Sequence, residues 1–538
     1  MRSIAIVHPT LLRLSFISAL GAIFAACASC ILLLLWKIQQ ERKNHIKFPL
    51  LGHKQSADLK EIVESQWIQD KEKKYVLQLP IRPIHVLPTH YVNDYAWKPE
   101  HQISSNIDLR ERLLGSWTRI GSMTPEAPGD PTHSLISFIK QDLTKNAGAF
   151  VPSVHEEVMA TIDEQIGDCP DWKPLSAYWL SLNFTLRIFE HVYVGLDLCR
   201  SKKWNEACMG YSSSAVATVA ALMRYPWWMR PFVAPFLRGI KDLKRNMDVL
   251  ENLLNPIVKT RLKSMKESAD FQRPNDFIQW WIEKVDQKRE DTYAMTASLI
   301  GLNFAGIRST GVVLMQALFD LASRSEYIAP LREELERVMA EEGGENLSPR
   351  AMAKLPLMDS FLKESQRHVA QNILSVYRKV MAPLTLKDGT ILPTGSYVCI
   401  PSMDPEVDPK SLHRDFDGFR WARLRKETGR DGKYLSVATG PDSLEFGYGS
   451  HACPGRFFAV NVLKAIVARL LLKYDLKLRD GDTANAQPKY NRILVLMPDT
   501  ERVVEFRRRG REEGGGEREK EKEEEKTTSE VGCKTEGF

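Results

Sequence analysis

Apolar residues recur at three- and four-residue spacing through the middle of the chain. This spacing dominates residues 134–323 and is especially regular over residues 248–264, as expected for amphipathic helices. Over residues 295–322 the apolar positions cover most of the helix circumference, so this long helix is predicted to be buried. The pattern therefore predicts a mainly α-helical protein.

Alternating apolar and polar positions in two shorter regions predict a small β-rich lobe. Residues 76–88 alternate and contain three prolines, which predicts short strands broken by turns. Strand-like pieces return over residues 376–401, where Lys-Asp-Gly-Thr at 387–390 predicts a hairpin turn.

An uncharged apolar run occupies residues 14–36. At about 1.5 Å per residue it reaches roughly 34 Å, enough to cross a bilayer core of about 30 Å. We predict an uncleaved transmembrane signal anchor, preceded by a lumenal segment at residues 1–13. More basic residues follow the run than precede it, which favours the cytosol for the downstream chain.

Composition divides the remainder of the chain into three parts. Residues 37–75 are charged and are predicted to form a linker, and residues 76–506 form the predicted globular domain. Residues 507–538 are rich in Arg, Glu, Lys and Gly and have few large apolar side chains. This last segment cannot bury a core, so we predict a disordered charged tail.

The charge and the cysteines exclude some classes of protein. The formal net charge of +6 is mild, and no dense basic patch with interleaved aromatic residues is present, which argues against nucleic-acid binding. The eight cysteines are scattered and show no disulfide framework, so reduced thiols in a cytosol-facing protein are expected.

One cysteine stands in an unusual setting. Cys453 lies in a glycine-rich stretch, residues 446–456, that leads directly into an apolar helical segment. Glycines let backbone N–H groups approach the sulfur, and the N-terminus of the following helix favours the thiolate. The alternatives are a buried free cysteine and a zinc site, although His451 and Cys453 have no second close Cys/His pair.

These residues resemble the haem-binding loop of cytochromes P450. Phe446, Gly449, Cys453 and Gly455 fill the four fixed positions of the family pattern F-x-x-G-x-x-x-C-x-G. The resemblance implies haem b with Cys453 as its axial thiolate ligand, in the mainly α-helical fold of the family with its small β-rich lobe. It also implies electrons from NADPH through a membrane-bound cytochrome P450 reductase.

A second motif of the resembling family is Glu364-Ser-Gln-Arg367. Three-residue spacing places the carboxylate and the guanidinium on one face of a helix, and the family joins such a pair to a downstream arginine, here Arg420. An exposed helical pair is the alternative. Gly418 stands where many members have proline, which predicts a less rigid loop.

The long helix contains a third motif, Ala305-Gly-Ile-Arg-Ser-Thr310, which resembles the oxygen-activation segment of the family. The resemblance implies that Gly306 leaves room beside the iron and that Ser309 or Thr310 helps to deliver protons. Arg308 replaces the usual acid, and arginine cannot shuttle protons at physiological pH because it stays charged. An ion pair with a nearby carboxylate is the structural interpretation of Arg308.

Residues 172–204 and 455–473 resemble fungal membrane-bound members of the secondary-metabolism type, such as the ent-kaurene oxidase-like group, and the resemblance extends over residues 76–506. It implies that His451 and Arg378 contact the haem propionates. It also implies a single-pass protein of the endoplasmic reticulum membrane whose catalytic domain faces the cytosol.

The expected function is monooxygenation of an apolar small molecule of terpenoid, indole or polyketide type. Two alternatives remain open at this stage. One is an oxidative rearrangement or isomerisation on the same fold, suggested by Arg308. The other is a haem-binding or scaffold protein without turnover, against which the retained Cys453, Glu364, Arg367 and Arg420 argue.

Overall fold

A computed structural model describes most of the chain between residues 73 and 510. The described ranges are 50–51, 73–78, 82–120, 138–144, 147–284, 292–343, 347–368, 374–402, 416–479, 489–490, 496–497 and 500–510, with the single residues 29, 136 and 372. These residues fall into two compact units. The first contains those up to Asp108 and Val376–Pro401, and the second contains those of Leu109–Ser375 and from Ser402 onward.

The first unit is built on a sheet. Among the described residues this sheet has six strands in the order β1-β2-β3-β9-β6-β4. Their bounds are Leu50–Leu51, Tyr75–Gln78, Pro83–Val86, Tyr397–Pro401, Leu374–Val380 and Ile103–Ser104. β2 and β3 are antiparallel, whereas β3 and β9 are parallel. Short helices η1 (Thr89–Tyr91) and α3 (Val92–Tyr95) accompany the strands, and α4 (Ser105–Arg112) begins in the first unit and ends in the second.

The predicted strands and hairpin turn are confirmed. β7 (Leu384–Thr385) and β8 (Ile391–Leu392) pair in antiparallel register, and Gly389 supplies the positive φ of 82° between them that glycine adopts without steric cost. β1, at Leu50–Leu51, pairs with β2 although it falls inside the predicted linker. The domain boundaries themselves stay predictions.

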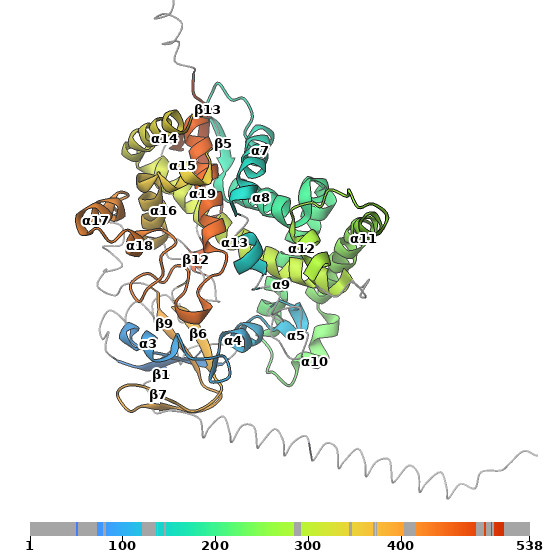
Figure 1. Ribbon diagram of the computed structural model, residues 1–538. Helices are drawn as coiled ribbons and strands as arrows, with labels where there is room; N and C mark the ends of the chain where they lie inside the picture. The colour runs from blue at the N-terminus through green and yellow to red at the C-terminus, as the bar shows by residue number, and fades with distance from the viewer. Residues whose placement is uncertain are drawn as a thin grey trace, which may run out of the picture. The chain divides into compact units, whose positions relative to one another are not determined.

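The second unit is mainly helical (Figure 1). Its longer helices are α7 (Ala147–Gln165), α8 (Ala177–Cys199), α9 (Lys202–Leu222), α11 (Arg238–Glu267), α12 (Phe277–Lys284), α13 (Thr292–Ser323), α14 (Ile328–Glu342), α16 (Pro356–His368), α17 (Arg420–Thr428) and α19 (Arg456–Lys473). Shorter pieces are α5 (Gly115–Thr118), η2 (Phe138–Leu143), α10 (Arg230–Val233), η3 (Ala234–Phe236), η4 (Ser325–Tyr327), α15 (Pro349–Ala353), α18 (Asp431–Tyr434) and η5 (Gly449–His451). β5 (Lys173–Ser176), β13 (Val503–Arg508) and β10 (Tyr474–Leu478) form a small sheet, and β11 (Lys489–Tyr490) pairs with β12 (Leu496–Met497).

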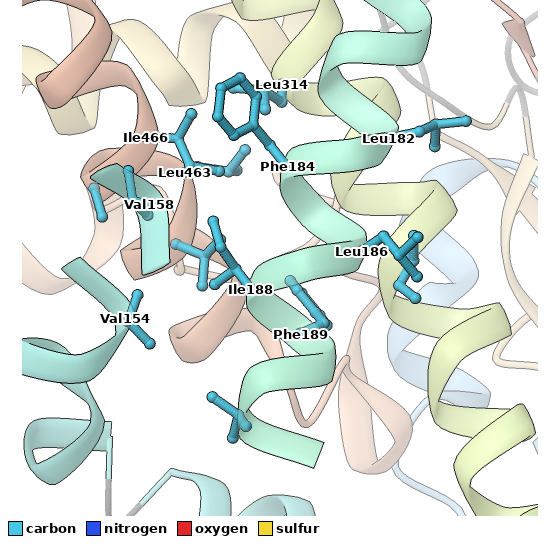
Figure 2. Close-up of a cluster of buried hydrophobic side chains, with 14 of the residues drawn as sticks. Val154, Val158, Leu182, Phe184, Leu186, Ile188, Phe189, Leu314, Leu463 and Ile466 are labelled. Carbon is cyan, nitrogen blue, oxygen red and sulfur yellow. The ribbon is translucent and has the colours of Figure 1, made fainter. Parts of the chain in front are cut away.

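Helix α8 organises the core of this unit. Its N-cap is Ser176, whose hydroxyl accepts a hydrogen bond from the Trp179 N–H and so satisfies one donor of the first turn. Figure 2 shows side chains of α8 meeting those of α7, α13 and α19 in one apolar cluster. Fully burying a side chain such as Phe184 contributes roughly 1.5–3 kcal/mol, so this contact fixes α13 and α19 beside α8.

The predicted long helix over residues 295–322 is confirmed as α13, which runs from Thr292 to Ser323. Among the described residues it is also the one helix long and apolar enough to cross a membrane, with a mean hydropathy of 1.3, but 67% of that window is buried inside the protein. Its apolar character is therefore that of a core helix. The predicted anchor at residues 14–36 lies outside the described residues, apart from Ser29.

Candidate active site

The loop that carries Cys453 is a sharply turned segment immediately before α19. Gly447 and Gly449 have φ values of 69° and 81°, a region that favours glycine. The Cys453 N–H donates to the carbonyl of Phe446 at 2.8 Å, which closes the loop on itself. This backbone geometry gives a reason for glycine at position 449, whereas the carbonyl at position 446 could come from any residue.

The surroundings of the Cys453 sulfur act on its ionisation in opposite directions. Burial raises the pKa of the thiol, while the backbone N–H groups of Gly455 and Arg456 and the charge of Arg456 favour the thiolate. The Arg456 side chain is held in place by the carbonyls of Cys453, at 2.8 Å, and Val437, at 3.1 Å. The loop thus offers donors to an anionic sulfur, which a metal-bound thiolate requires.

Cys453 opens onto a cavity of about 310 Å³ whose described lining lies in the second unit. Apolar side chains dominate its wall, including Leu302, Phe189 and Phe458. The α13 wall also contributes Ala305, Gly306, Ser309 and Thr310. The structure therefore brings the loop and the α13 motif, which are far apart in sequence, to one cavity.

Two hydroxyls of the predicted proton-delivery motif line this cavity. The Ser309 hydroxyl donates back to the carbonyl of Ala305 at 2.6 Å, a common bond for serine inside a helix. Thr310 is buried and lines the same space. Their part in proton delivery stays a prediction.

Gly306 has a packing reason that the sequence did not reveal. A Cβ at this position would lie 2.6 Å from Cε1 of Phe189 and 3.4 Å from the hydroxyl of Tyr193, both on α8. Likewise, a Cβ on Gly311 would lie 2.8 Å from Cδ2 of Leu182 on α8. Glycine at these two positions lets α8 approach α13 closely.

Replacing Gly306 by alanine should therefore strain the contact between α8 and α13. The new methyl group must displace the Phe189 ring, and overpacking of a filled core costs about 1–3 kcal/mol. We expect a lower unfolding midpoint in urea, with an unchanged m-value. The adjacent Ala305→Gly variant, on the cavity side, serves as the control for a change of one methyl group in the same helix.

Arg308 lies on the same helix, half-buried. Its Nε is buried and has no hydrogen-bond partner, and no carboxylate of the described residues is paired with it. The expected ion pair is thus not found in the described part of the chain. The sequence alone could not show whether Arg308 has a carboxylate partner, because such a partner depends on how neighbouring helices pack.

The structure brings Glu364, Arg367 and Arg420 together. Arg367 donates to both carboxylate oxygens of Glu364, at 2.7 and 2.9 Å, and Nη2 of Arg420 lies 3.6 Å from Oε1. The Trp421 indole and the Asp417 backbone N–H also donate to this carboxylate, at 3.0 and 3.1 Å. The arrangement is a buried network and not an exposed helical pair, because Glu364 is fully buried.

Gly418 packs tightly, contrary to the predicted loss of rigidity in its loop. A Cβ here would lie 2.7 Å from Cε1 of Tyr327 and 2.9 Å from Cδ2 of Phe361. The aromatic rings of Tyr327, Phe361, Phe416 and Phe419 contact one another around this glycine. The loop that presents Arg420 is therefore held by packing.

A proline or an alanine at position 418 should destabilise the protein for this reason. We expect Gly418→Ala to lower the free energy of unfolding by about 1–3 kcal/mol. Gly429 has a positive φ of 62° and open space around it. The control variant Gly429→Ala therefore introduces backbone strain without steric overlap. A loss in Gly418→Ala that stays the same when Tyr327 is replaced by a smaller residue would contradict the steric explanation.

The two residues expected to contact haem propionates lie in different units. His451 ends η5 just before Cys453 and is half-buried. Arg378 lies on β6 in the first unit, buried, with Nη1 donating to the Tyr377 carbonyl at 2.8 Å and to the Ser105 hydroxyl at 3.4 Å. Their contacts with a haem stay predictions.

A second cluster of ligand-type side chains lies away from the cavity. Glu157, His191 and Cys199 place their ligand atoms within 4.8 Å of one another. Burial would raise the pKa of Glu157, but hydrogen bonds from Arg200 and Arg187 hold it below its usual value. Because two cations already neutralise this carboxylate, the cluster is explained as a buried ion-pair network.

The sequence did not indicate two polar residues near the cavity. Tyr193 lines the cavity from α8, and Glu190, one turn earlier, is fully buried and accepts a hydrogen bond from Asn303 of α13 at 2.6 Å. An acidic residue in an apolar helix does not by itself indicate that the residue lies near a cavity. Only the crossing of α8 and α13 shows which groups surround it.

Comparison with known proteins identifies the class. The sequence model of the family described as Cytochrome P450 matches residues 142–506, so the chain belongs to the cytochrome P450 family. It is similar to the fungal cytochrome P450 monooxygenase BOA4 of Botryotinia fuckeliana, with 30% identity over 89% of this chain and 95% of the relative. It is also similar to the monooxygenase olcJ of Penicillium canescens, with 32% identity over 79% of each chain.

A solved structure confirms the fold. Retinoic acid-bound cyanobacterial CYP120A1 superimposes with a TM-score of 0.63 over 86% of this chain and 99% of its own, at 15% sequence identity. The predicted mainly α-helical cytochrome P450 fold and the resemblance to fungal members are thus confirmed. The ent-kaurene oxidase-like detail stays a prediction.

The residues at the site fit the haem–thiolate group of this family. Among the described lining residues Cys453 is the one thiol, and no histidine accompanies it. Its sulfur accepts backbone hydrogen bonds from Gly455 and Arg456, which is the environment that tunes an iron–thiolate centre. The rest of the wall is apolar enough to receive a hydrophobic macrocycle.

Proposed function

We propose that this cytochrome P450 monooxygenase inserts one atom of dioxygen into an apolar small molecule of fungal secondary metabolism, of terpenoid, indole or polyketide type. The observation that carries the proposal is the shared cavity, which both Cys453 and Ser309 line. An apolar wall selects an apolar substrate but does not name it.

In this proposal Cys453 holds haem b, and the loop residues Phe446 and Gly449 shape its position. When bound, the haem supplies oxygen activation, to which the thiolate contributes electron density. Ser309 and Thr310 hold and pass protons on the α13 side of the cavity. His451 and Arg378 hold the propionates, while Glu364, Arg367 and Arg420 fix the geometry behind the loop.

We infer that electrons come from NADPH through a cytochrome P450 reductase and that the protein is anchored in the endoplasmic reticulum membrane. The proposed organisation is a lumenal segment at 1–13, an anchor at 14–36, a linker at 37–75, a catalytic domain at 76–506 and a charged tail at 507–538. The catalytic domain faces the cytosol, where the reductase delivers electrons.

An exposed aromatic patch supports a membrane location. Trp227, Trp228, Phe232 and Phe236, between α9 and α11, are all exposed, and Phe236 is 82% exposed. Such side chains favour a membrane–water interface. We expect hydrogen exchange of residues 226–237 to be slower in microsomes than in detergent, and equal exchange in the two settings would count against lipid contact.

Labelled dioxygen tests the proposed reaction. Microsomes carrying the protein are incubated with NADPH, reductase and a panel of terpenoid, indole and polyketide candidates. The expected product retains one atom from labelled dioxygen and none from labelled water. Efficient turnover without reductase, giving an unlabelled product, would instead support the second candidate function, an oxidative rearrangement or isomerisation, which the position of Arg308 favours.

A further inference from the structure

Glu445 carries the one carboxylate among the described residues that line the cavity. No lysine, arginine or histidine stands beside it in that described lining, and the wall is otherwise mainly apolar. A charged group in such a setting is costly unless a nearby group compensates it. Glu445 directly precedes Phe446, whose carbonyl accepts a hydrogen bond from the Cys453 N–H at 2.8 Å. This charge is therefore attached to the loop that holds the Cys453 sulfur.

A buried lysine on α16 compensates the charge of Glu445. Lys363 is only 2% exposed, and its Nζ donates to the hydroxyl of Ser443 at 2.9 Å. The Ser443 hydroxyl lies 2.8 Å from Oε2 of Glu445, closer than its other acceptor, the Ala438 carbonyl at 3.3 Å. A hydroxyl can accept from the lysine and donate to the carboxylate at the same time. Two consecutive hydrogen bonds thus join Lys363 to the cavity wall.

The surroundings of Lys363 fit a charged ammonium group. Its Nζ also donates to the Leu435 carbonyl at 3.1 Å and lies 5.0 Å from the centre of the Trp421 ring, within range of a cation–π contact. Together with Ser443, these groups are three partners for the three N–H donors of a charged lysine. Burial lowers the pKa of Lys363, and the negative charge of Glu445 acts against this. The lysine therefore has the partners that stabilise its charge.

A second side chain of α16 holds the segment between Lys363 and the loop. Asp359, one turn before Lys363, accepts hydrogen bonds from the N–H and the hydroxyl of Ser436, at 2.8 and 2.7 Å. The peptide group between Leu435 and Ser436 is thus bound at its carbonyl by Lys363 and at its N–H by Asp359. Because both polar groups of one peptide are held, α16 fixes the segment that leads to the Cys453 loop.

We propose that Lys363 and Glu445 form a charge pair, bridged by the Ser443 hydroxyl, that sets the reduction potential of the haem held at Cys453. The inference rests on the proposed function, because it takes Cys453 as the haem ligand. Reduction adds one negative charge to the centre, so the Glu445 carboxylate disfavours it and the Lys363 ammonium favours it. Partly buried charges are screened less than exposed ones. Lys363 does not line the cavity and acts from behind Glu445, so it is a positioning residue.

The test measures the reduction potential of the full-length haem protein in Lys363→Met, Glu445→Gln and the double variant. A spectroelectrochemical titration gives the ratio of ferrous to ferric haem at a fixed potential. Glu445→Gln should raise this ratio by about threefold or more, and Lys363→Met should lower it by a similar factor. The double variant should lie close to the unmodified protein, since both charges are removed together. Unchanged ratios in the single variants, or shifts of the same sign, would overturn the proposal.

Ser360→Ala controls for the loss of a buried polar group on the same helix. The Ser360 hydroxyl is buried and accepts from the N–H groups of Trp421 and Ala422 at 3.1 and 3.2 Å. Its loss should lower the unfolding midpoint and leave the ratio unchanged, because no charge is removed. Should Lys363→Met fail to fold, Glu445→Gln decides alone, since glutamine has nearly the same size as glutamate. An unchanged or lowered ratio in Glu445→Gln would then sink the charge pair.

The ferrous carbon monoxide spectrum separates this inference from the proposed function. All four variants retain Cys453 and should keep the red-shifted Soret band of the unmodified protein. Absence of the band in the unmodified protein would overturn the haem assignment and the charge pair with it. A band that is present while the single variants leave the potential unchanged would overturn the charge pair alone.

Discussion

Glu364→Gln is expected to destabilise the protein by about 3–5 kcal/mol, the usual cost of removing one partner from a buried ion pair. Glu364 is fully buried and accepts hydrogen bonds from Arg367, Trp421 and the Asp417 backbone, and it forms an ion pair with Arg420 at 3.6 Å. The neutral amide leaves two guanidinium groups without their counter-charge. Urea unfolding followed by circular dichroism measures the loss, and a decrease in bound haem should accompany it.

Glu341→Gln is the matched control. It forms an ion pair with Arg337 at 2.7 Å, but both side chains are exposed, and exposed pairs contribute little to stability. We expect its unfolding midpoint to equal that of the unmodified protein. If Glu364→Gln behaved like this control, the network would have no structural role.

Cys453→Ala is expected to abolish turnover. The substitution removes the one thiol of the described cavity lining while leaving the loop closed by the backbone bond between residues 453 and 446. The fold should therefore survive, because a single small side chain is lost at a half-buried position. NADPH-dependent product formation in microsomes measures the effect, at equal protein content.

Cys169→Ala controls for the loss of a thiol elsewhere. Cys169 is buried and does not line the cavity. Its replacement should leave product formation within about twofold of the unmodified protein, since a small cavity far from the site costs stability more than activity. Loss of turnover in both variants would indicate a general effect of core packing.

Local sequence patterns predicted much of the fold and identified Cys453, which lines the cavity. The apolar periodicity of α13 and the glycine spacing around Cys453 are properties of short segments, so both could be recognised from the sequence. The pairing of Glu364 with Arg367 is likewise local, because it needs only one helical turn. Arg420 could be added only through resemblance to the family.

The features that the sequence did not predict depend on how the helices cross. Gly306 was expected to leave room beside the iron, but its position is also required by Phe189 of α8. Glu190 meets Asn303, 113 residues later in the chain, and no spacing rule joins them. Gly418 was expected to loosen its loop, whereas an aromatic cluster from three separate segments fills the space around it.

The ferrous carbon monoxide spectrum tests the central claim that Cys453 is the thiolate ligand of a haem. The unmodified protein should give the red-shifted Soret band that marks a thiolate-ligated haem. Cys453→Ala should lose this band, even when haem is still bound, and Cys169→Ala should keep it. A red-shifted band that persists in Cys453→Ala would contradict the account.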